Sequence, residues 1–286
     1  GLQDFSVSRP SSRSKGWGVL VPGDPSQTMY VWYDALANYI TALGYPDEQA
    51  ELYRKFWLEN SDRTHFLGKG VSRFHAIFWP AILKSASVPV PTREFIHGYL
   101  TIDGQKMSKT LGNVVDPSDL VQTYGADAVR YYLLREIPAY GDGDFSIAKF
   151  EDRYNGDLAN GLGNFVARVL ALGEKAGDMK AGPLDPRIEA MIEKTRRDVD
   201  EKVSEFKFHE ALASVWALIG EGDAYTNEKK PWERSDAQVL YTLVVIVDNL
   251  AAILASFLPR VSEKITSAIE WTSKTSLRVK KIAPLF

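Results

Sequence analysis

The sequence contains no cysteine, and this absence excludes both disulfides and zinc sites built from thiolates. Histidine is also scarce. The four histidines are scattered along the chain, which argues against any other metal site: His65, His75, His97 and His209. The lack of cysteine fits a reducing compartment. We therefore expect a cytoplasmic protein without bound zinc, and a mitochondrial one remains the alternative.

The chain also lacks an excess of one charge. Its net charge of -3 gives no global attraction to nucleic acid, so any RNA contact must come from a local patch, and DNA is not an expected partner. We recognise no signal peptide. The most apolar stretch, Val239 to Leu258, contains Asp248 and Asn249 and predicts a buried helix rather than a membrane span. We expect no membrane partner. The opening Gly1-Leu2-Gln3 suggests a start inside a larger gene product.

The most informative stretch is Gly98 to Pro117, GYLTIDGQKMSKTLGNVVDP. Glu94 to Leu100 predicts a short buried strand, and Asp103-Gly104 predicts a tight turn. Two lysines three residues apart follow, and Asp116-Pro117 forms an N-cap with proline at the first helical position. Such a loop suits a polyphosphate, because each ammonium within about 4 Å of a phosphate contributes about 4 kcal/mol at an effective dielectric near 20. Most isolated K-x-x-K spacings, however, lie in solvated hairpins.

Two earlier blocks each predict a strand followed by a helix. In the first, Tyr30 to Trp32 is β-rich and a helix follows from about Asp34 to Leu43. In the second, a strand over Thr64 to Leu67 leads through a glycine turn into a helix near Val71. A glycine turn after a strand lets the backbone approach a nucleotide, but two glycines alone are a weak signal. Aromatic residues in such places usually belong to the core.

The second half of the chain predicts helices only. The segment 138–147, PAYGDGDFSI, predicts a domain boundary, giving domains 1–137 and 138–286. Apolar residues then recur at helical spacing and predict an antiparallel bundle. The fold class is therefore α/β plus all-α. Within the bundle, Asn164 and Arg168 share one helix face, which on spacing alone is more often a solvated polar face.

These motifs together resemble a known family. KMSKT at 106–110, with LGNVVDP after it, resembles the KMSKS signature of class I aminoacyl-tRNA synthetases. YVWYDALANYITALGYP and HFLGKGVSRFHAIFWPAILK resemble the methionyl-tRNA synthetase family, of the bacterial or mitochondrial type. The resemblance implies that 1–137 is the C-terminal half of a Rossmann-type catalytic domain. It implies that 138–286 is a helical anticodon-binding domain.

The resemblance also implies roles for individual residues. Those expected to act in catalysis, by steering the triphosphate and stabilising the leaving pyrophosphate, are Lys106, Ser108 and Lys109. ATP, accompanied by Mg²⁺, is expected to contact Gly68, His97, Gly98, Leu100, Met107 and Lys109. Methionine is expected to lie among Trp32, Tyr39, His75, Phe78 and Trp79, with the Tyr39 phenol donating weakly to the thioether. The anticodon of tRNA(Met) is expected to contact Asn164, Arg168 and Trp232.

Three departures from the family pattern qualify this interpretation. The family reads GKD where this chain has Gly70, no H-x-G-H sequence occurs, and the zinc-knuckle insertion is absent. We therefore expect that residues 1–286 alone do not form methionyl adenylate, and that a separate N-terminal half carrying the HIGH motif is a partner. The chain would then be a truncated enzyme or one piece of a split enzyme. The alternative is a non-catalytic tRNA anticodon-binding module. A class I synthetase for another amino acid fits poorly, because the leucyl, isoleucyl and valyl enzymes are not expected to carry FHAIFWPA.

Overall fold

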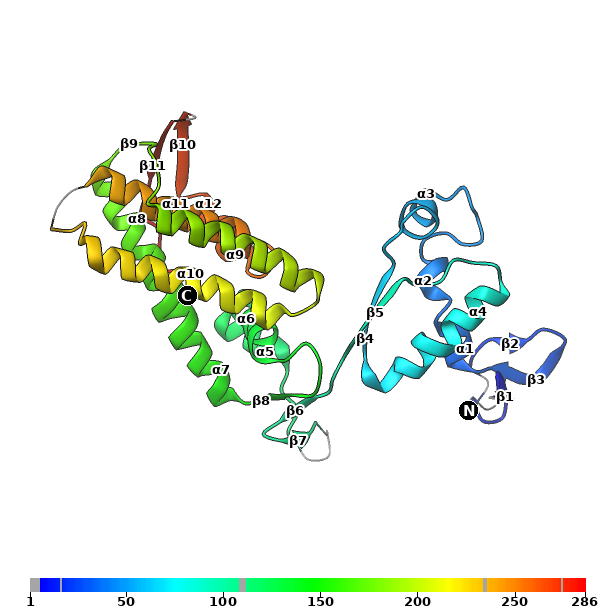
Figure 1. Cartoon of the computed structure of the whole chain (residues 1–286). Coiled ribbons are helices and arrows are strands. Elements are labelled where there is room, and N and C mark those ends of the chain that lie inside the picture. Colours follow the sequence, from blue (N-terminus) through cyan, green and yellow to red (C-terminus); the bar gives the residue numbers. More distant parts are fainter. Residues whose placement is uncertain (1–5, 16, 108–111, 234–235, 274) are drawn as a thin grey trace. The chain divides into compact units, whose positions relative to one another are not determined.

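The computed structural model describes residues 6–15, 17–107, 112–233, 236–273 and 275–286. It divides into two compact units, Gly1–Gly98 and Tyr99–Phe286, and each is described by itself (Figure 1).

The first unit combines short strands with short helices. Its elements in chain order are β1 (Ser8–Pro10), β2 (Leu20–Val21), β3 (Asp24–Met29), α1 (Val31–Ala35), α2 (Asn38–Thr41), α3 (Glu51–Tyr53), the π-helical turn η1 (Arg54–Leu58), β4 (Thr64–Gly68), the 3₁₀ turn η2 (Lys69–Val71), the π-helical turn η3 (Phe74–Phe78), α4 (Trp79–Ser85) and β5 (Arg93–His97). Strands β1, β3 and β2 form an antiparallel sheet in that order. Strands β4 and β5 pair in parallel, with Phe66 opposite Phe95. The helical stretch η2–η3–α4 connects them, as a parallel pair requires.

The core of the first unit is small and rich in aromatic residues. Its buried hydrophobic cluster consists of Leu36, Ile40, Tyr53, Trp57, Trp79, Leu83 and Val88. The predicted strand over Thr64 to Leu67 is confirmed by β4. The predicted strand over Tyr30 to Trp32 is wrong, because β3 ends at Met29 and helix α1 begins at Val31. The single helix expected over Asp34 to Leu43 is divided into α1 and α2, which are separated at Leu36 and Ala37.

The second unit is mainly helical. Its elements in chain order are β6 (Leu100–Ile102), β7 (Gln105–Lys106), α5 (Pro117–Tyr124), α6 (Ala126–Glu136), β8 (Gly143–Phe145), α7 (Ile147–Arg153), the π-helical segment η5 (Tyr154–Gly163), α8 (Asn164–Ala176), β9 (Met179–Lys180), α9 (Pro186–Ser204), α10 (Phe208–Lys229), α11 (Ala237–Leu254), α12 (Pro259–Thr266), β10 (Ile269–Ser273) and β11 (Ser276–Val279). Two three-stranded sheets, β7-β6-β8 and β10-β11-β9, accompany the helices. The prediction of helices only in the second half of the chain is therefore wrong, because β9, β10 and β11 pair with one another there.

The stretch around the lysine motif is only partly as predicted. Asp103 and Gly104 both have positive φ and form the tight turn between β6 and β7, as expected. The Asp116 side chain accepts a hydrogen bond from the Ser118 backbone N–H at 2.8 Å, which confirms the N-cap. The expected strand over Glu94 to Leu100 is interrupted, because β5 ends at His97 and β6 begins a different sheet at Leu100.

The chain divides into its two compact units at a different residue from the predicted domain boundary. They separate after Gly98, whereas the sequence placed the boundary at 137/138. The physical reason is long-range pairing: β6 lies parallel to β8, and helix α6 packs against α10. Residues 99–137 therefore share a core with the helices. The assignment of functional domains stays a prediction.

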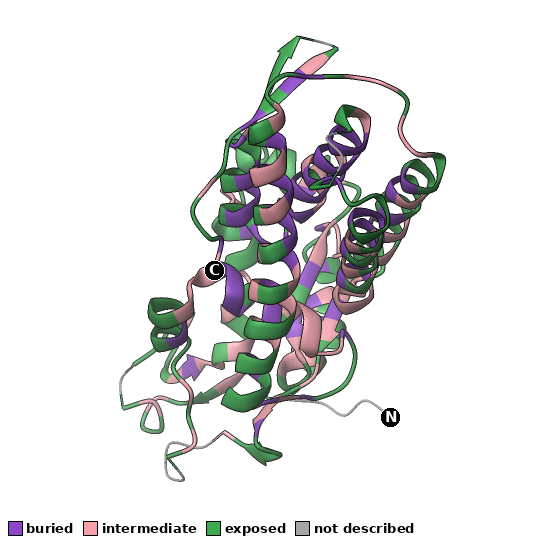
Figure 2. Ribbon diagram, turned by 90° about the vertical axis from the view of Figure 1, so that its left-hand side faces the viewer, coloured by how far each residue is buried: buried purple, intermediate pink, exposed green. Residues whose placement is uncertain are grey.

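The helices of the second unit enclose one large core. Figure 2 shows buried positions facing inward along these helices and exposed positions facing outward. Helices α9 and α10 pack side by side as a hairpin joined by residues 205–207. Helix α11 has a mean hydropathy of 1.9 and would be long enough to cross a membrane, but 67% of it is buried inside this unit. The prediction of a buried helix is confirmed.

Candidate functional site

The five residues predicted to contact methionine fall into two neighbouring aromatic groups of the first unit, which together are called the aromatic cluster: Tyr39, His75 and Trp79 in one, and Trp32 and Phe78 with Phe74 in the other. The Tyr39 ring centroid lies 5.8 Å from that of His75 and 6.3 Å from that of Trp79. Trp32 stacks on Phe74 at 4.7 Å, and Phe74 in turn contacts Phe78 at 5.6 Å. The two groups are linked through η3, which carries His75, Phe74 and Phe78. Such walls suit a soft, polarisable thioether.

Hydrogen bonds fix the polarity of this cluster. His75 Nδ1 lies 3.0 Å from the Val71 carbonyl oxygen, and His75 Nε2 lies 3.0 Å from the Tyr39 hydroxyl. Because a carbonyl can only accept, Nδ1 carries the proton and Nε2 accepts from the phenol. The single Tyr39 proton is therefore directed at His75. The sequence analysis expected this proton to be donated to the methionine thioether instead. Donation to the thioether would require the Tyr39–His75 hydrogen bond to break first.

Two polar atoms in the cluster have no hydrogen-bond partner among the described residues. They are His65 Nδ1 and Trp79 Nε1, and both side chains are buried. The His65 ring lies 4.4 Å from the Tyr39 ring and 6.0 Å from the Trp57 ring. Burial, with a smaller contribution from His75, lowers the pKa of His65 to about 4. His65 is therefore a neutral member of the cluster near pH 7.

The residues predicted to contact ATP fall into both units. Gly68 and His97 are opposite each other at the carboxyl ends of β4 and β5, the edge where parallel sheets bind nucleotides. A Cβ at Gly68 would lie 3.4 Å from the His97 ring, so a side chain there would crowd this edge. Gly98 ends the first unit, whereas Leu100 lies in β6 and Met107 is partly buried against the core of the second unit.

The lysine motif is described only at its start. Lys106 is an exposed residue of β7, and its carbonyl oxygen accepts from Asn113 Nδ2 at 3.2 Å. Ser108, Lys109 and Thr110 lie outside the described residues. Their predicted roles stay predictions.

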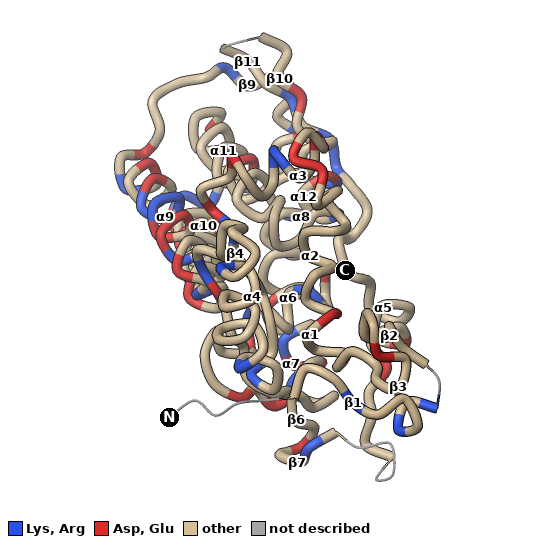
Figure 3. The backbone as a smooth tube through the Cα atoms, turned by 90° about the vertical axis from the view of Figure 1, so that its right-hand side faces the viewer, with Lys and Arg blue, Asp and Glu red and all other residues tan. Residues whose placement is uncertain are grey.

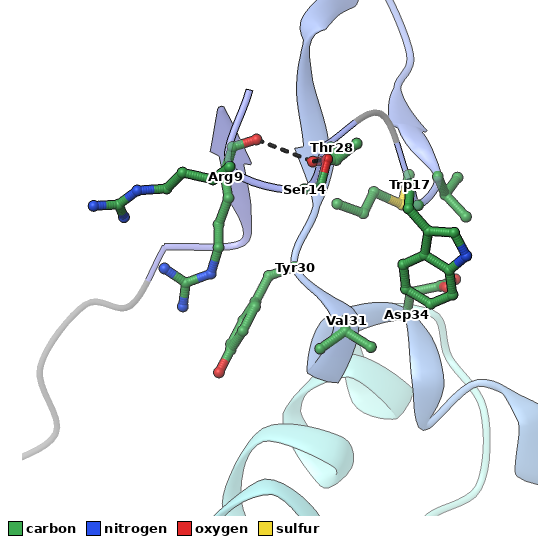
Figure 4. A pocket seen from close by; sticks show the side chains of 11 residues that line it. Arg9, Ser14, Trp17, Thr28, Tyr30, Val31 and Asp34 are labelled. Atoms are coloured by element: carbon green, nitrogen blue, oxygen red, sulfur yellow. Dashed lines mark hydrogen bonds between the residues drawn. The ribbon is translucent and has the colours of Figure 1, made fainter. Parts of the chain in front are cut away.

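A separate cavity of about 420 Å³ lies between the first antiparallel sheet and α1. Figure 4 shows the Arg9 side chain over the Tyr30 ring, and the guanidinium carbon is 4.1 Å from the ring centroid. The Thr28 hydroxyl donates to the Arg9 carbonyl oxygen at 3.2 Å. The Tyr30 ring also packs edge-on against Phe74 at 6.4 Å. The cavity therefore adjoins the aromatic cluster, although no predicted site residue lines it.

In the second unit, a hollow of about 700 Å³ contains two of the three predicted anticodon residues. Its lining comes from η5, α8, α10 and the C-terminal segment: Asn160, Asn164, Ala167, Arg168, Ala171, Asp223, Asn227 and Lys281. Arg168 Nη2 donates to Asp223 Oδ1 across α8 and α10. Trp232 is half exposed just beyond α10 and does not line the hollow. Lys229 and Lys230 pair with Glu228 and Glu233.

Helices α9 and α10 carry charges of both signs. Figure 3 shows Lys and Arg interspersed with Asp and Glu along α9 and α10. Arg187 at the start of α9, for example, pairs with Glu221 and Glu228 of α10. These charges pair with one another, whereas the hollow is lined by asparagine amides as well as by an ion pair.

The family model for tRNA synthetases class I (M) matches residues 1–170. The chain belongs to the methionyl-tRNA synthetase family of class I. It is 41% identical to the methionine–tRNA ligase of Clostridium tetani over 94% of its own length, and 41% identical to that of Thermosynechococcus vestitus over 93%. It covers 43% and 52% of those two relatives, respectively. It thus spans about half the length of the curated relatives it matches.

A solved structure of a family member is also similar. The methionyl-tRNA synthetase of Mycobacterium tuberculosis in complex with methionyl-adenylate superimposes with a TM-score of 0.90 at 34% identity. The match covers 100% of this chain and 60% of the M. tuberculosis chain. At this identity, the similarity supports comparing the sites as well as the fold.

Two residues beside the candidate sites, His65 and Asp223, were not predicted from the sequence. His65 could have been found from the alternation in β4, which turns it inward together with Leu67. Asp223 could not, because its pairing with Arg168 joins two helices 55 residues apart in sequence. Among the described residues, no group of three potential metal ligands gathers at one place.

Proposed function

We propose that this chain is the C-terminal part of a methionine–tRNA ligase, working in the cytoplasm. In the reaction, the methionine carboxylate attacks the α-phosphorus of ATP, pyrophosphate leaves, and methionyl adenylate forms. A ribose hydroxyl of the terminal adenosine of tRNA(Met) then attacks the methionyl carbonyl and releases AMP. The observation that carries the proposal is the gathering of Tyr39, His75 and Trp79 in one cluster of a chain of this family.

Substrate binding and the departure of pyrophosphate are assigned to residues of this chain. The aromatic cluster holds the methionine side chain, and Gly68, His97, Gly98, Leu100 and Met107 contact ATP. Lys106, Ser108 and Lys109 stabilise the charge of the departing pyrophosphate, which makes catalysis mainly positioning and electrostatics. Mg²⁺ accompanies ATP, and no residue of this chain is assigned as its ligand.

The proposal includes an N-terminal half that carries the HIGH motif, either joined to this chain or as a separate partner, because this sequence lacks the motif. The exposure of 58% for Phe66 on β4 supports it, because parallel sheets are normally covered on both faces. The test is methionine-dependent exchange of pyrophosphate into ATP, measured for this chain alone and with a HIGH-bearing N-terminal half added. We expect exchange only in the mixture, and its loss with Lys109→Ala. Robust exchange by the chain alone would refute the need for the partner, and no exchange in either sample would refute the enzyme proposal.

A second candidate is a non-catalytic module that binds the tRNA anticodon through Asn164, Arg168 and Trp232. Gly70, in place of the family's usual aspartate, favours it. Gly70→Asp distinguishes the two candidates in the same assay. If the chain is part of an enzyme, we expect the substitution to preserve or raise exchange in the mixture. For a binding module, neither protein supports exchange while both bind the anticodon stem-loop.

A further inference from the structure

The Arg168–Asp223 ion pair raises the question of what the hollow in the second unit accepts. This inference rests on the proposed anticodon function. The two side chains come from α8 and α10 and are only partly exposed, at 36% and 38%. Burial raises the pKa of the Asp223 carboxyl, and the Arg168 charge opposes that rise. The carboxyl group thus loses hydration in this position and depends on Arg168 for its charge balance.

The pair also orients the guanidinium. Arg168 Nη2 is engaged by Asp223, whereas the buried Arg168 Nε has no hydrogen-bond partner among the described residues. The guanidinium donors form a rigid planar fork, so a contact at one nitrogen restricts the directions in which the remaining donors point. Without Asp223, the same side chain would be free to swing towards solvent and towards any nearby phosphate.

The rest of the lining is suited to a neutral, hydrogen-bonding ligand. The amides of Asn160, Asn164 and Asn227 line the hollow and offer it both donors and acceptors. Ala167 and Ala171 are small and leave room on the α8 side. Asp223 neutralises Arg168, so the lining keeps a single uncompensated charge, that of Lys281, instead of two. Phosphates are bound by excess positive charge, whereas base edges are read by paired donors and acceptors.

We propose that Asp223 is a positioning residue that neutralises and orients Arg168, so that the hollow selects the edge of an unstacked base and rejects phosphate. Specificity arises because a base of the correct hydrogen-bonding pattern engages the fixed donors. RNA of other sequences gains nothing from a paired arginine. Removing the carboxylate converts Arg168 from a reader of bases into a general phosphate contact.

The test uses the whole chain and stem-loop RNAs with the anticodon CAU or with one anticodon base changed. Affinities are measured by fluorescence anisotropy over a range of salt concentrations. With Asp223→Asn, which keeps the shape and removes the charge, we expect binding to altered loops to strengthen. The preference for CAU should fall by about tenfold. The slope of log affinity against log salt should steepen by about 0.7, the value for one added single-strand phosphate contact.

A matched control is Asp198→Asn, which removes the same charge from an ion pair with Lys194 on α9 of the same bundle. We expect it to leave the preference for CAU unchanged. A double-mutant cycle with Arg168→Gln measures the coupling of the two residues in the preference for CAU. If Asp223 only stabilised the bundle, this coupling would be absent. If Asp223 acts through Arg168, Asp223→Asn has no further effect on specificity once Arg168 is replaced.

The outcomes separate this inference from the function on which it rests. If the unaltered chain shows no preference for CAU, the anticodon proposal itself is overturned. If it prefers CAU and Asp223→Asn retains both that preference and the salt slope, the role of Asp223 is refuted and the anticodon site stands. Thermal unfolding of each variant verifies that the bundle is intact, and Asp223→Glu, which keeps the charge, should retain most of the preference.

Discussion

The two units of this chain form their cores from different chemistry. The first has a small cluster in which three aromatic side chains pack with four aliphatic ones, and two buried histidines lie in the same unit. The second has a far larger core in which aliphatic side chains predominate, with Leu243, Val244 and Leu250 fully buried. In the first unit the proposed ligand site is part of the core itself. In the second unit it is a hollow on the surface of a bundle. We therefore expect substitutions at the proposed methionine site to change stability and binding together, whereas those at the proposed anticodon site can change binding alone.

The largest effect is expected from the aliphatic core. Leu243→Ala removes a fully buried side chain in the middle of α11 and should lower the free energy of unfolding of the second unit by about 3–4 kcal/mol. Urea unfolding followed by far-ultraviolet circular dichroism measures this. A loss below about 1 kcal/mol would show that the helices are not tightly packed, which would contradict the comparison.

The second effect tests the buried histidine of the aromatic core. Because the pKa of His65 in the folded protein is about 4, below its usual value, the unfolded chain binds the proton more readily. Stability from this group is therefore present above about pH 6.5 and is lost as the pH falls towards 4. We expect a loss on the order of 2 kcal/mol, which allows for partial solvent screening.

His65→Phe is the matched variant for this measurement. It should abolish that loss, and the difference between the two proteins isolates His65 from the other groups near the cluster. Glu94 lies opposite His65 on β5, and burial raises the pKa of its carboxyl, so its contribution has the opposite sign: it is present at low pH and lost as the pH rises. Parallel pH profiles of the two proteins would rule out a buried neutral His65.

How far the sequence predicted this structure depended on the range of the interactions. Local signals were reliable: the Asp116 N-cap and the Asp103-Gly104 turn depend on neighbouring residues and are as predicted. The strand predicted over Tyr30 to Trp32 was wrong, because β-branched and aromatic residues favour a strand only where a partner strand exists. The division after Gly98 depends on the pairing of β6 with β8, which no local pattern reveals. The same pairing places residues 99–137 in one core with the helices.

The candidate sites followed the same rule. Family motifs predicted Tyr39, His75 and Trp79, and the structure brings them together. The direction of the Tyr39 proton was not predictable, because it depends on the Val71 carbonyl fixing the tautomer of His75. Asp223 was missed because its partner lies on another helix.

A smaller effect tests the Tyr39–His75 hydrogen bond. Tyr39→Phe leaves buried His75 Nε2 without its donor, and we expect it to lower the stability of the first unit by about 1–2 kcal/mol. Urea unfolding monitored by tryptophan fluorescence reports it, with the neighbouring Tyr33→Phe as the control. No change relative to that control would mean that the phenol does not donate to His75.

The smallest effect is expected on the outer surface of the bundle. Arg197 lies 3.9 Å from Glu193 on α9, and both side chains are largely exposed. Arg197→Ala should change stability by less than about 0.5 kcal/mol, because exposed ion pairs are screened by solvent. A loss above about 1 kcal/mol in the same urea assay would show that this pair is better ordered than its exposure indicates.

The central claim is that the two units bind different ligands, methionine in the aromatic cluster and an RNA loop on the helical bundle. The most direct test is a nitrogen-15 spectrum of the seven tryptophan indole N–H groups of the whole chain. Our account predicts that millimolar methionine shifts the signal of Trp79, whose Nε1 has no hydrogen-bond partner among the described residues, and leaves that of Trp232 in place. The CAU stem-loop should do the reverse. Methionine shifting Trp232, or the RNA shifting Trp79 alone, would contradict it.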